Sequence, residues 1–165
     1  MGMLDDDDFR RWFTGAEDGL VRYAVLCCGD LDVAEDLVAD AVARLWPAWR
    51  TGRIENPDGY VRRIIANRLT DRRRRAAVRR RVEAGIRPIP ATADPTGAAD
   101  DQLTLWPLVL ALPPKQRAVI VLRYYESRSE EEIADLLDVP PGTVKSRAAR
   151  GLDQLRARLR EVPHG

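Results

Sequence analysis

Apolar residues recur at intervals of three and four along most of this 165-residue chain, and that spacing restricts the folds open to it. In the last such segment, the spacings are four, four, three and four, from Val144 through Ala148, Leu152, Leu155 and Leu159. Residues spaced in this way line one face of an α-helix. Alternating strands bounded by tight-turn pairs are almost absent. The sequence therefore predicts an all-α protein.

Cap and turn residues divide the periodic segments into separate helices. Gly29 can end a first helix that begins at about residue 8, and Asp30 or Asp32 can cap the next one. Ser129 followed by Glu132 has the spacing of a capping box, in which the hydroxyl and the carboxylate each accept from the other residue's backbone N–H. Further helices are expected from Pro57 onward, over 103–112, over 119–124 and, after Pro141, over the final segment.

One internal segment lacks this periodicity. Residues 83–101, "EAGIRPIPATADPTGAADD", are rich in Pro, Ala, Gly and Thr, which is typical of a flexible linker. Two small helical domains are therefore expected on either side, at residues 1–82 and 102–165. Apolar residues make up 45% of the chain, which is enough for each to bury a core.

The net charge of +1 conceals a strong segregation of charge along the chain. The segment 30–40 contains acids and no base, whereas 60–82 contains ten arginines and the single acid Asp71, about +9 by direct count. The run Arg72 to Arg75 is too dense for one helix face. Like charges this close repel, so phosphate binding explains the run better than simple solvation.

Several classes of protein are not indicated. No run of 18 apolar residues predicts a membrane span, and the acidic start "MGMLDDDD" is unlike a secretory signal. Cys27 and Cys28 are adjacent, which gives no disulfide framework. The only histidine is His164, and no metal-ligand spacing, phosphate loop or nucleophile motif is present. We expect a cytoplasmic protein that is not an enzyme and has no metal or cofactor.

The last two helices have the pattern of a helix-turn-helix. Ala134 is small enough to let the helices approach, and Val139 and Val144 can fill the angle between them. With its apolar face buried, the final helix turns a basic face outward, and Arg and Lys on such a face can donate to guanine in the major groove. A solvated basic face is the alternative reading. The outward residues are Lys145, Ser146, Ala149 and Arg150, with Arg147 at the border.

These motifs resemble one known family. "EEEIADLLDVPPGTVKSRAARGLDQLR", preceded by "LPPKQRAVIVLRYYE", is similar to region four of bacterial RNA polymerase sigma factors of the extracytoplasmic-function (ECF) type. "DVAEDLVADAVARLWPAW" and "NPDGYVRRIIANRLTDRRRR" resemble their region two. The resemblance covers nearly the whole chain in the family's order. The chain departs from the pattern at Asp138, which often is Gly, at Pro141, where Glu is common, and at Ala39, which replaces a frequent Gln.

The resemblance implies a region 2 helical bundle, a region 4 helix-turn-helix and a function in promoter-specific transcription initiation. The resemblance implies that the −35 element is contacted by Arg123, Thr143, Lys145, Ser146, Arg147, Ala149 and Arg150. It implies that the melted −10 element is contacted by Asn56, Tyr60, Arg62, Arg63, Asn67, Arg68 and Arg72, although Tyr60 can equally be a core residue. It implies that polymerase is bound by Glu35, Asp36, Leu37, Val38, Asp40 and Trp46.

The partners implied are promoter DNA, the clamp helices of the polymerase β′ subunit and an anti-sigma factor, with no membrane and no small-molecule substrate. The 19 residues of 83–101 span about 60 Å at roughly 3.3 Å per residue, similar to about 18 base pairs at roughly 3.4 Å each. Two other hypotheses remain open. One is a stand-alone, dimeric helix-turn-helix regulator, and the other is an adaptor whose acidic helix binds another protein.

Overall fold

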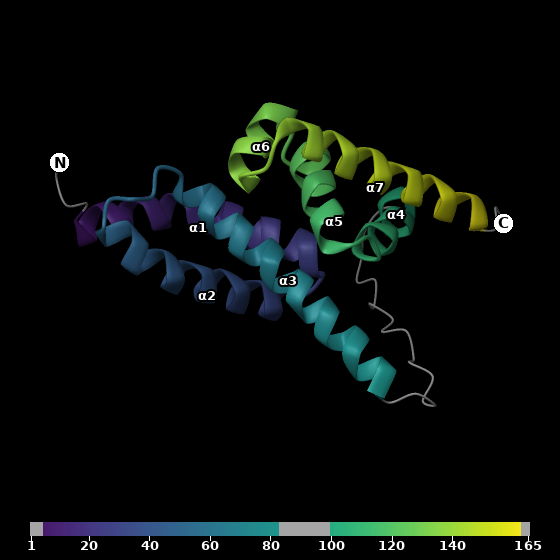
Figure 1. The fold of residues 1–165 in the computed structure, drawn as a ribbon, viewed down its shortest axis with the longest axis horizontal. Helices are drawn as coiled ribbons and strands as arrows, with labels where there is room; N and C mark the ends of the chain where they lie inside the picture. The colour runs from purple at the N-terminus through teal and green to yellow at the C-terminus, as the bar shows by residue number, and fades with distance from the viewer. Residues whose placement is uncertain (1–4, 83–99, 163–165) are drawn as a thin grey trace.

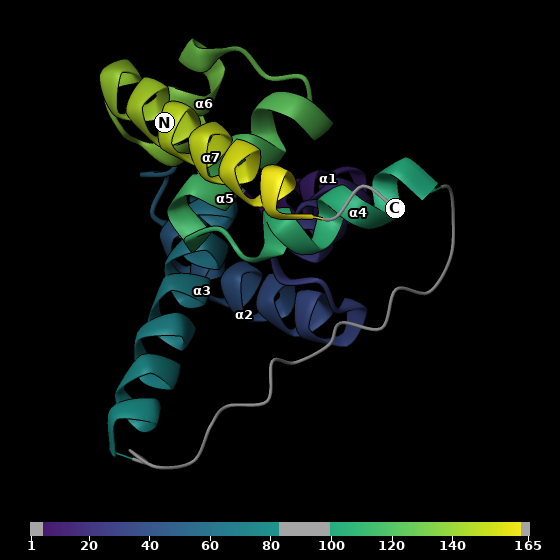
Figure 2. The same ribbon diagram turned by 90° about the vertical axis from the view of Figure 1, so that its right-hand side faces the viewer.

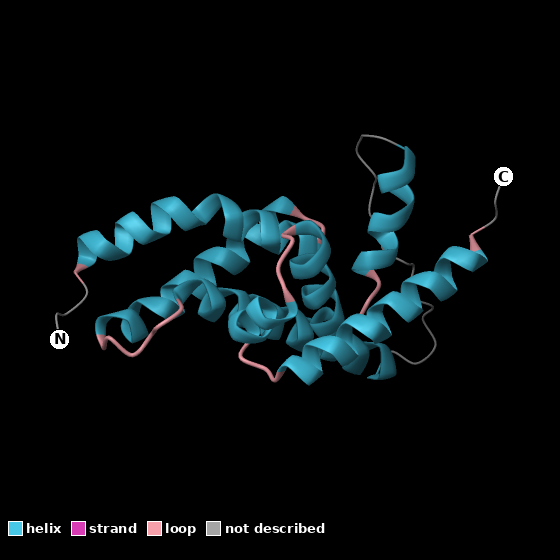
Figure 3. Cartoon of the chain, turned by 90° about the horizontal axis from the view of Figure 1, so that it is seen from above, coloured by secondary structure: helices cyan, strands magenta, loops and turns pink. Residues whose placement is uncertain are grey.

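The computed structural model describes residues 5–82 and 100–162, and every regular element in these ranges is a helix (Figures 1 and 3). The predicted all-α fold is confirmed. No helix in these ranges is both long and apolar enough to cross a membrane. In chain order the elements are α1 Asp6–Cys28, α2 Leu31–Arg50, α3 Pro57–Val82, α4 Asp100–Leu110, α5 Pro114–Ile120, the π-helix η1 Val121–Tyr125, α6 Glu130–Leu137 and α7 Pro141–Glu161.

The predicted caps set most of these boundaries. Gly29 ends α1 in the left-handed region, with φ 80°, and the Asp30 side chain accepts from the backbone N–H of Val33 at 3.0 Å to start α2. Ser129 accepts from the N–H of Glu132 at 3.1 Å, whereas the Glu132 carboxylate lies 3.4 Å from a guanidinium nitrogen of Arg128. Only the hydroxyl half of the predicted capping box is therefore present among the described contacts.

Helices α1, α2 and α3 form a first unit, and α4 to α7 form a second. The first unit buries one face of each helix, with Leu20, Tyr23, Leu45 and Ile65 excluded from solvent. The second does the same with Leu112, Leu122, Ile133 and Val144. Both cores follow from the three-and-four spacing, because that spacing gives each helix one wide apolar face.

The two units pack directly against each other. Helix α3 contacts both α5 and α6, and α1 contacts η1, so that the buried residues of both units form one continuous cluster. Figure 1 shows α6 lying over the first turns of α3, and Figure 2 shows the outer half of α3 projecting away from the rest of the molecule. Most of the linker expected at 83–101, namely residues 83–99, lies outside the described residues. Its last two residues belong to α4, which begins at Asp100.

The second half of α7 differs from expectation. Leu159, which its spacing predicts to be buried, is 37% exposed, and Leu152 is half-buried. Helix α7 has 21 residues and is about 30 Å long, whereas α5 and α6 have only 7 and 8 residues and cannot cover its whole length. Leu159 therefore lies at the edge of an apolar groove that it shares with Tyr124 and Tyr125.

Candidate nucleic-acid and polymerase interfaces

Helix α7 follows α6 through a tight turn that fixes which face it exposes. Asp138 takes a left-handed conformation, with φ 52°, and the N–H of Val139 donates to the carbonyl of Ala134 at 3.1 Å. Val144 and Ala148 are then buried against the neighbouring helices. The predicted outward orientation is confirmed for Lys145, Ser146, Ala149 and Arg150, which are exposed, while Thr143 and Arg147 are half-buried.

Arg123, the remaining residue expected to face the −35 element, lies in η1. Its guanidinium is 2.8 Å from the carboxylate of Glu130 at the start of α6 and stacks over the ring of Tyr124 at 5.8 Å. The hydrogen bond that Arg123 donates to the Glu130 carboxylate raises the pKa of Arg123, because it favours the charged guanidinium. This pairing holds the cation beside the helix-turn-helix.

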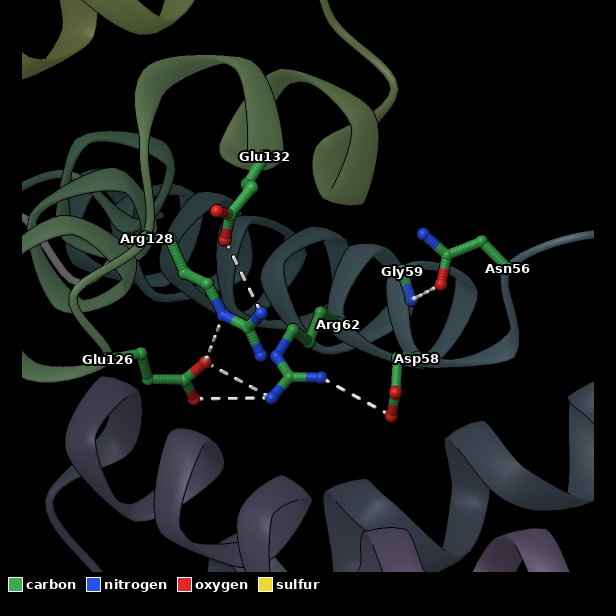
Figure 4. Close-up of polar contacts among 7 residues, drawn as sticks. All are labelled: Asn56, Asp58, Gly59, Arg62, Glu126, Arg128 and Glu132. Carbon is green, nitrogen blue, oxygen red and sulfur yellow. Dashed lines mark hydrogen bonds and ion pairs between the residues drawn. The ribbon is translucent and has the colours of Figure 1, made fainter.

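Arg62 occupies a different environment from the one expected for a DNA contact. It is only 5% exposed, its Nη2 lies 3.2 Å from both carboxylate oxygens of Glu126, and its Nη1 lies 3.5 Å from Asp58 (Figure 4). The guanidinium also lies over the Tyr23 ring, 5.3 Å from its centre. In this arrangement Arg62 joins α3 to the second unit and does not face solvent.

Two other α3 arginines of the −10 set are also in ion pairs. Arg63 Nη1 is 3.1 Å from the carboxylate of Asp138 in the turn before α7, and Arg68 Nη2 is 3.0 Å from that of Asp40 in α2. Both side chains are about one-third exposed. Their charges are therefore partly neutralised as long as the two units stay packed and α2 stays beside α3.

The rest of the −10 set lies at the start of α3 or on its exposed face. Asn56 accepts from the N–H of Gly59 at 2.9 Å and caps the helix, and Tyr60 is half-buried beneath the Arg63 guanidinium at 5.9 Å. Asn67 and Arg72 are exposed. The structure thus leaves Asn67 and Arg72 free to meet a ligand, whereas Asn56 has a structural contact.

The arginines beyond Asp71 surround the projecting half of α3. They are all exposed, and no ion pair to them is found among the described residues. A helix with cations on all sides and little contact with the core is a strong local source of positive potential. These residues are Arg72, Arg73, Arg74, Arg75, Arg79, Arg80 and Arg81.

The residues expected to bind polymerase divide between surface and core. Glu35 and Asp36 are exposed, and Asp40 is half-buried beside α3, whereas Leu37 and Val38 are 8% and 3% exposed and belong to the core. A groove of about 220 Å³ runs between α2 and α3 and is lined by acids of α2 and by three arginines and one acid of α3. At the far end of α2, Trp46 packs edge-on against Phe9 of α1 at 4.8 Å between ring centres and lies under Arg50.

The contacts between the two units include residues that sequence reasoning missed. Glu126 and Asp138 hold the α3 arginines, and Arg117 of α5 donates to the carbonyl of Cys27 at the end of α1 and to that of Leu112 at 2.7 Å. Burial lowers the pKa of Arg117. No local pattern marks these partners, because Glu126 lies 64 residues from Arg62 along the chain.

Comparison with known proteins agrees with this organisation. Residues 13–79 match the family described as Sigma-70 region 2, and residues 104–155 match Sigma-70, region 4. The chain is 35% identical to an RNA polymerase sigma-E factor of Streptomyces coelicolor over 92% of this chain and 86% of that protein. It is 33% identical to the ECF RNA polymerase sigma factor SigL of Mycobacterium tuberculosis over 87% of this chain and 84% of that one.

A solved structure shares the fold. The sigma factor RpoE of Bartonella quintana, crystallised with the anti-sigma factor NepR, superposes with a TM-score of 0.66 at 24% identity, covering 93% of this chain and 97% of that one. The superposition with RpoE extends over both helical units of this chain. On the strength of the family matches and the full-length relatives, the chain belongs to the ECF-type RNA polymerase sigma factors.

Proposed function

We propose that this sigma factor, which directs promoter-specific transcription initiation, reads the −35 element through the exposed face of α7. The observation that carries the proposal is the orientation of that helix, with Val144 and Ala148 buried and Lys145 and Arg150 in solvent. An α-helix fits the major groove of B-DNA, where arginine and lysine can donate to guanine O6 and N7. Ser146, Arg147, Thr143, Ala149 and Arg123 are the proposed flanking contacts.

We propose that α3 binds the −10 element as melted strand. Asn67 and Arg72 are exposed, and the arginines that follow supply cations for phosphates. Arg62, Arg63 and Arg68 would join them once their carboxylate partners are withdrawn, with Asn56 and Tyr60 beside the unstacked bases. The proposed domains are residues 1–82 and 102–165, joined by 83–101, and α4 of the second unit begins within that segment, at Asp100.

The acidic side of α2 is the proposed docking surface for the clamp helices of core RNA polymerase. Glu35, Asp36 and Asp40 supply the charge, and charge complementarity favours a basic partner helix. Leu37, Val38 and Trp46 would act indirectly by fixing α2 against α1 and α3. The protein would act in the cytoplasm beside polymerase and would not be an enzyme itself. Because the similar RpoE is known in complex with NepR, an anti-sigma protein is a further proposed partner.

Promoter binding also requires a change of conformation. Arg63, proposed for the −10 element, and Arg147, proposed for the −35 element, line one pocket of about 110 Å³ when the two units are packed. Two elements about 18 base pairs, or roughly 60 Å, apart cannot both be reached from one pocket. We therefore propose that the two units separate on the polymerase, with 83–101 spanning the distance.

Transcription in vitro tests this function. Core polymerase with the wild-type protein should initiate from a cognate promoter selected from a library, and the double substitution Lys145→Gln with Arg150→Gln should reduce initiation at least about tenfold by removing two charged contacts. Arg160→Gln, which removes an exposed cation at the far end of the same helix, should retain activity. A stand-alone regulator would bind duplex without core polymerase and would not confer initiation on it.

A further inference from the structure

A small pocket lies between the two units, where α3 meets α5 and the turn before α7. It has a volume of about 110 Å³ and a floor of apolar side chains from both units. Four polar residues complete its wall, two from α3 and two from the second unit. They are Arg63, Asn67, Lys115 and Arg147.

The charge of this pocket is one-sided. Three of its lining residues are cations and none is an acid. By contrast, the groove between α2 and α3 contains Asp36, Asp40 and Asp71 as well as arginines, and is internally compensated. Of its three cations only Arg63 has a carboxylate partner among the described residues, Asp138 at 3.1 Å, whose side chain is 81% exposed. Three cations and one acid leave two positive charges facing the pocket.

Lys115 and Arg147 have no ion pair among the described residues, and of these two Arg147 is the one that is partly withdrawn from solvent. Its side chain is half-buried, and no carboxylate within 4.0 Å of it is found among the described residues. Burial lowers the pKa of Arg147, which means that its guanidinium loses water without gaining a counter-charge. A bound anion would supply that charge and accept the guanidinium hydrogen bonds.

We propose that this pocket binds the phosphoryl group of a small phosphate-bearing anion and that the anion stabilises the packed arrangement of the two units. The volume equals about four water molecules at roughly 30 Å³ each, which is room for one phosphoryl group. Arg147 and Lys115 approach from one unit, and Arg63 and Asn67 approach from the other. Since the complete site exists only while the units are packed, the anion favours that state by mass action.

Titration calorimetry of the full chain with inorganic pyrophosphate tests the proposal, with ionic strength held constant by sodium chloride. The wild-type protein should bind one pyrophosphate. Arg147→Gln and Lys115→Gln should each weaken binding about tenfold, because each removes a charge-assisted hydrogen bond. Arg160→Gln, equal in charge change but at the far end of α7, should bind like the wild type. Glu126→Gln, which lies outside the pocket but weakens the packing of the units, should also weaken binding.

Three results would overturn the proposal. The first is heat no larger than that of a chloride titration, and the second is equal loss of affinity in Arg160→Gln and Arg147→Gln. The third is binding of a duplex oligonucleotide that depends on Arg147 and Lys115 while pyrophosphate does not bind, which would assign these cations to the DNA backbone alone. The pyrophosphate titration contains neither polymerase nor promoter, so its outcome is independent of the proposed promoter recognition.

Discussion

Arg62 in α3 and Glu126 after η1 form a buried ion pair that crosses the boundary between the two helical units. One guanidinium nitrogen lies 3.2 Å from both carboxylate oxygens, and the two side chains are 6% and 15% exposed. Asp58 and Arg128 extend the pair at 3.5 and 3.7 Å (Figure 4). A pair this shielded from water is sensitive to the loss of either partner, since the remaining charge stays buried.

Removing Glu126 should therefore destabilise the packed protein. Glu126→Ala leaves the Arg62 guanidinium buried with the half-exposed Asp58 as its remaining carboxylate partner, and we expect the free energy of unfolding to fall by about 3 kcal/mol. Urea denaturation followed by circular dichroism measures this change. Glu17→Gln, which neutralises an exposed acid of α1, is the control and should shift the free energy by less than about 0.5 kcal/mol. Equal effects of the two substitutions would contradict a specific role for the pair.

Two glycines offer a matched comparison of packing at the interface. A Cβ added to Gly59 would lie 2.8 Å from the backbone carbonyl oxygen of Leu136 in α6, whereas one added to Gly19 in α1 would meet nothing within 4 Å. Gly59→Ala should lower the free energy of unfolding by about 1–3 kcal/mol, because a backbone atom cannot move aside as a side chain can. Gly19→Ala should raise it by about 0.5–1 kcal/mol through helix propensity. If Gly59→Ala were neutral in thermal denaturation, α3 and α6 would not be in contact in solution.

The cap of α6 gives a prediction for the helix-turn-helix. Ser129→Ala removes the hydroxyl that accepts from the N–H of Glu132 at 3.1 Å and should cost about 1 kcal/mol. Ser129→Asp restores an acceptor at this position and should recover most of that loss. Ser146→Ala is the control, because its hydroxyl donates to the Thr143 carbonyl inside a formed helix and should have a smaller effect on thermal stability. A larger loss in Ser146→Ala than in Ser129→Ala would contradict the assignment.

Burial of Cys27 predicts a loss of stability in alkali. Burial raises the pKa of its thiol from 9.0 to about 12, so between these values the unfolded chain has released a proton that the folded chain still binds. The free energy of unfolding must then fall as the pH rises from about 9 towards 12. Urea denaturation at several pH values measures the slope. Cys27→Ala should show a shallower decline over this window, and an unchanged slope would show that other groups control the alkaline transition.

The helices and their order could be predicted from the sequence because their causes are local. A residue's own neighbours at three and four positions decide whether it lies on an apolar face, and Gly29, Asp30 and Ser129 act within one helical turn. The outward basic face of α7 could be predicted for the same reason. The prediction that Leu159 of α7 is buried was wrong, because burial at that position requires a neighbouring helix long enough to cover the end of α7.

Local sequence patterns are sufficient to predict the amphipathic helices, the basic character of α3 and α7, and the family to which their motifs point. Which arginines are free to bind a ligand depends instead on how the helices pack in three dimensions. The sequence predicts both Arg62 and Arg72 of α3 as DNA contacts. In the structure Arg62 is buried against Glu126, whereas Arg72 is exposed. The reason is that an ion pair depends on distance in space, and Glu126 is brought to Arg62 by the packing of two units that no local spacing encodes.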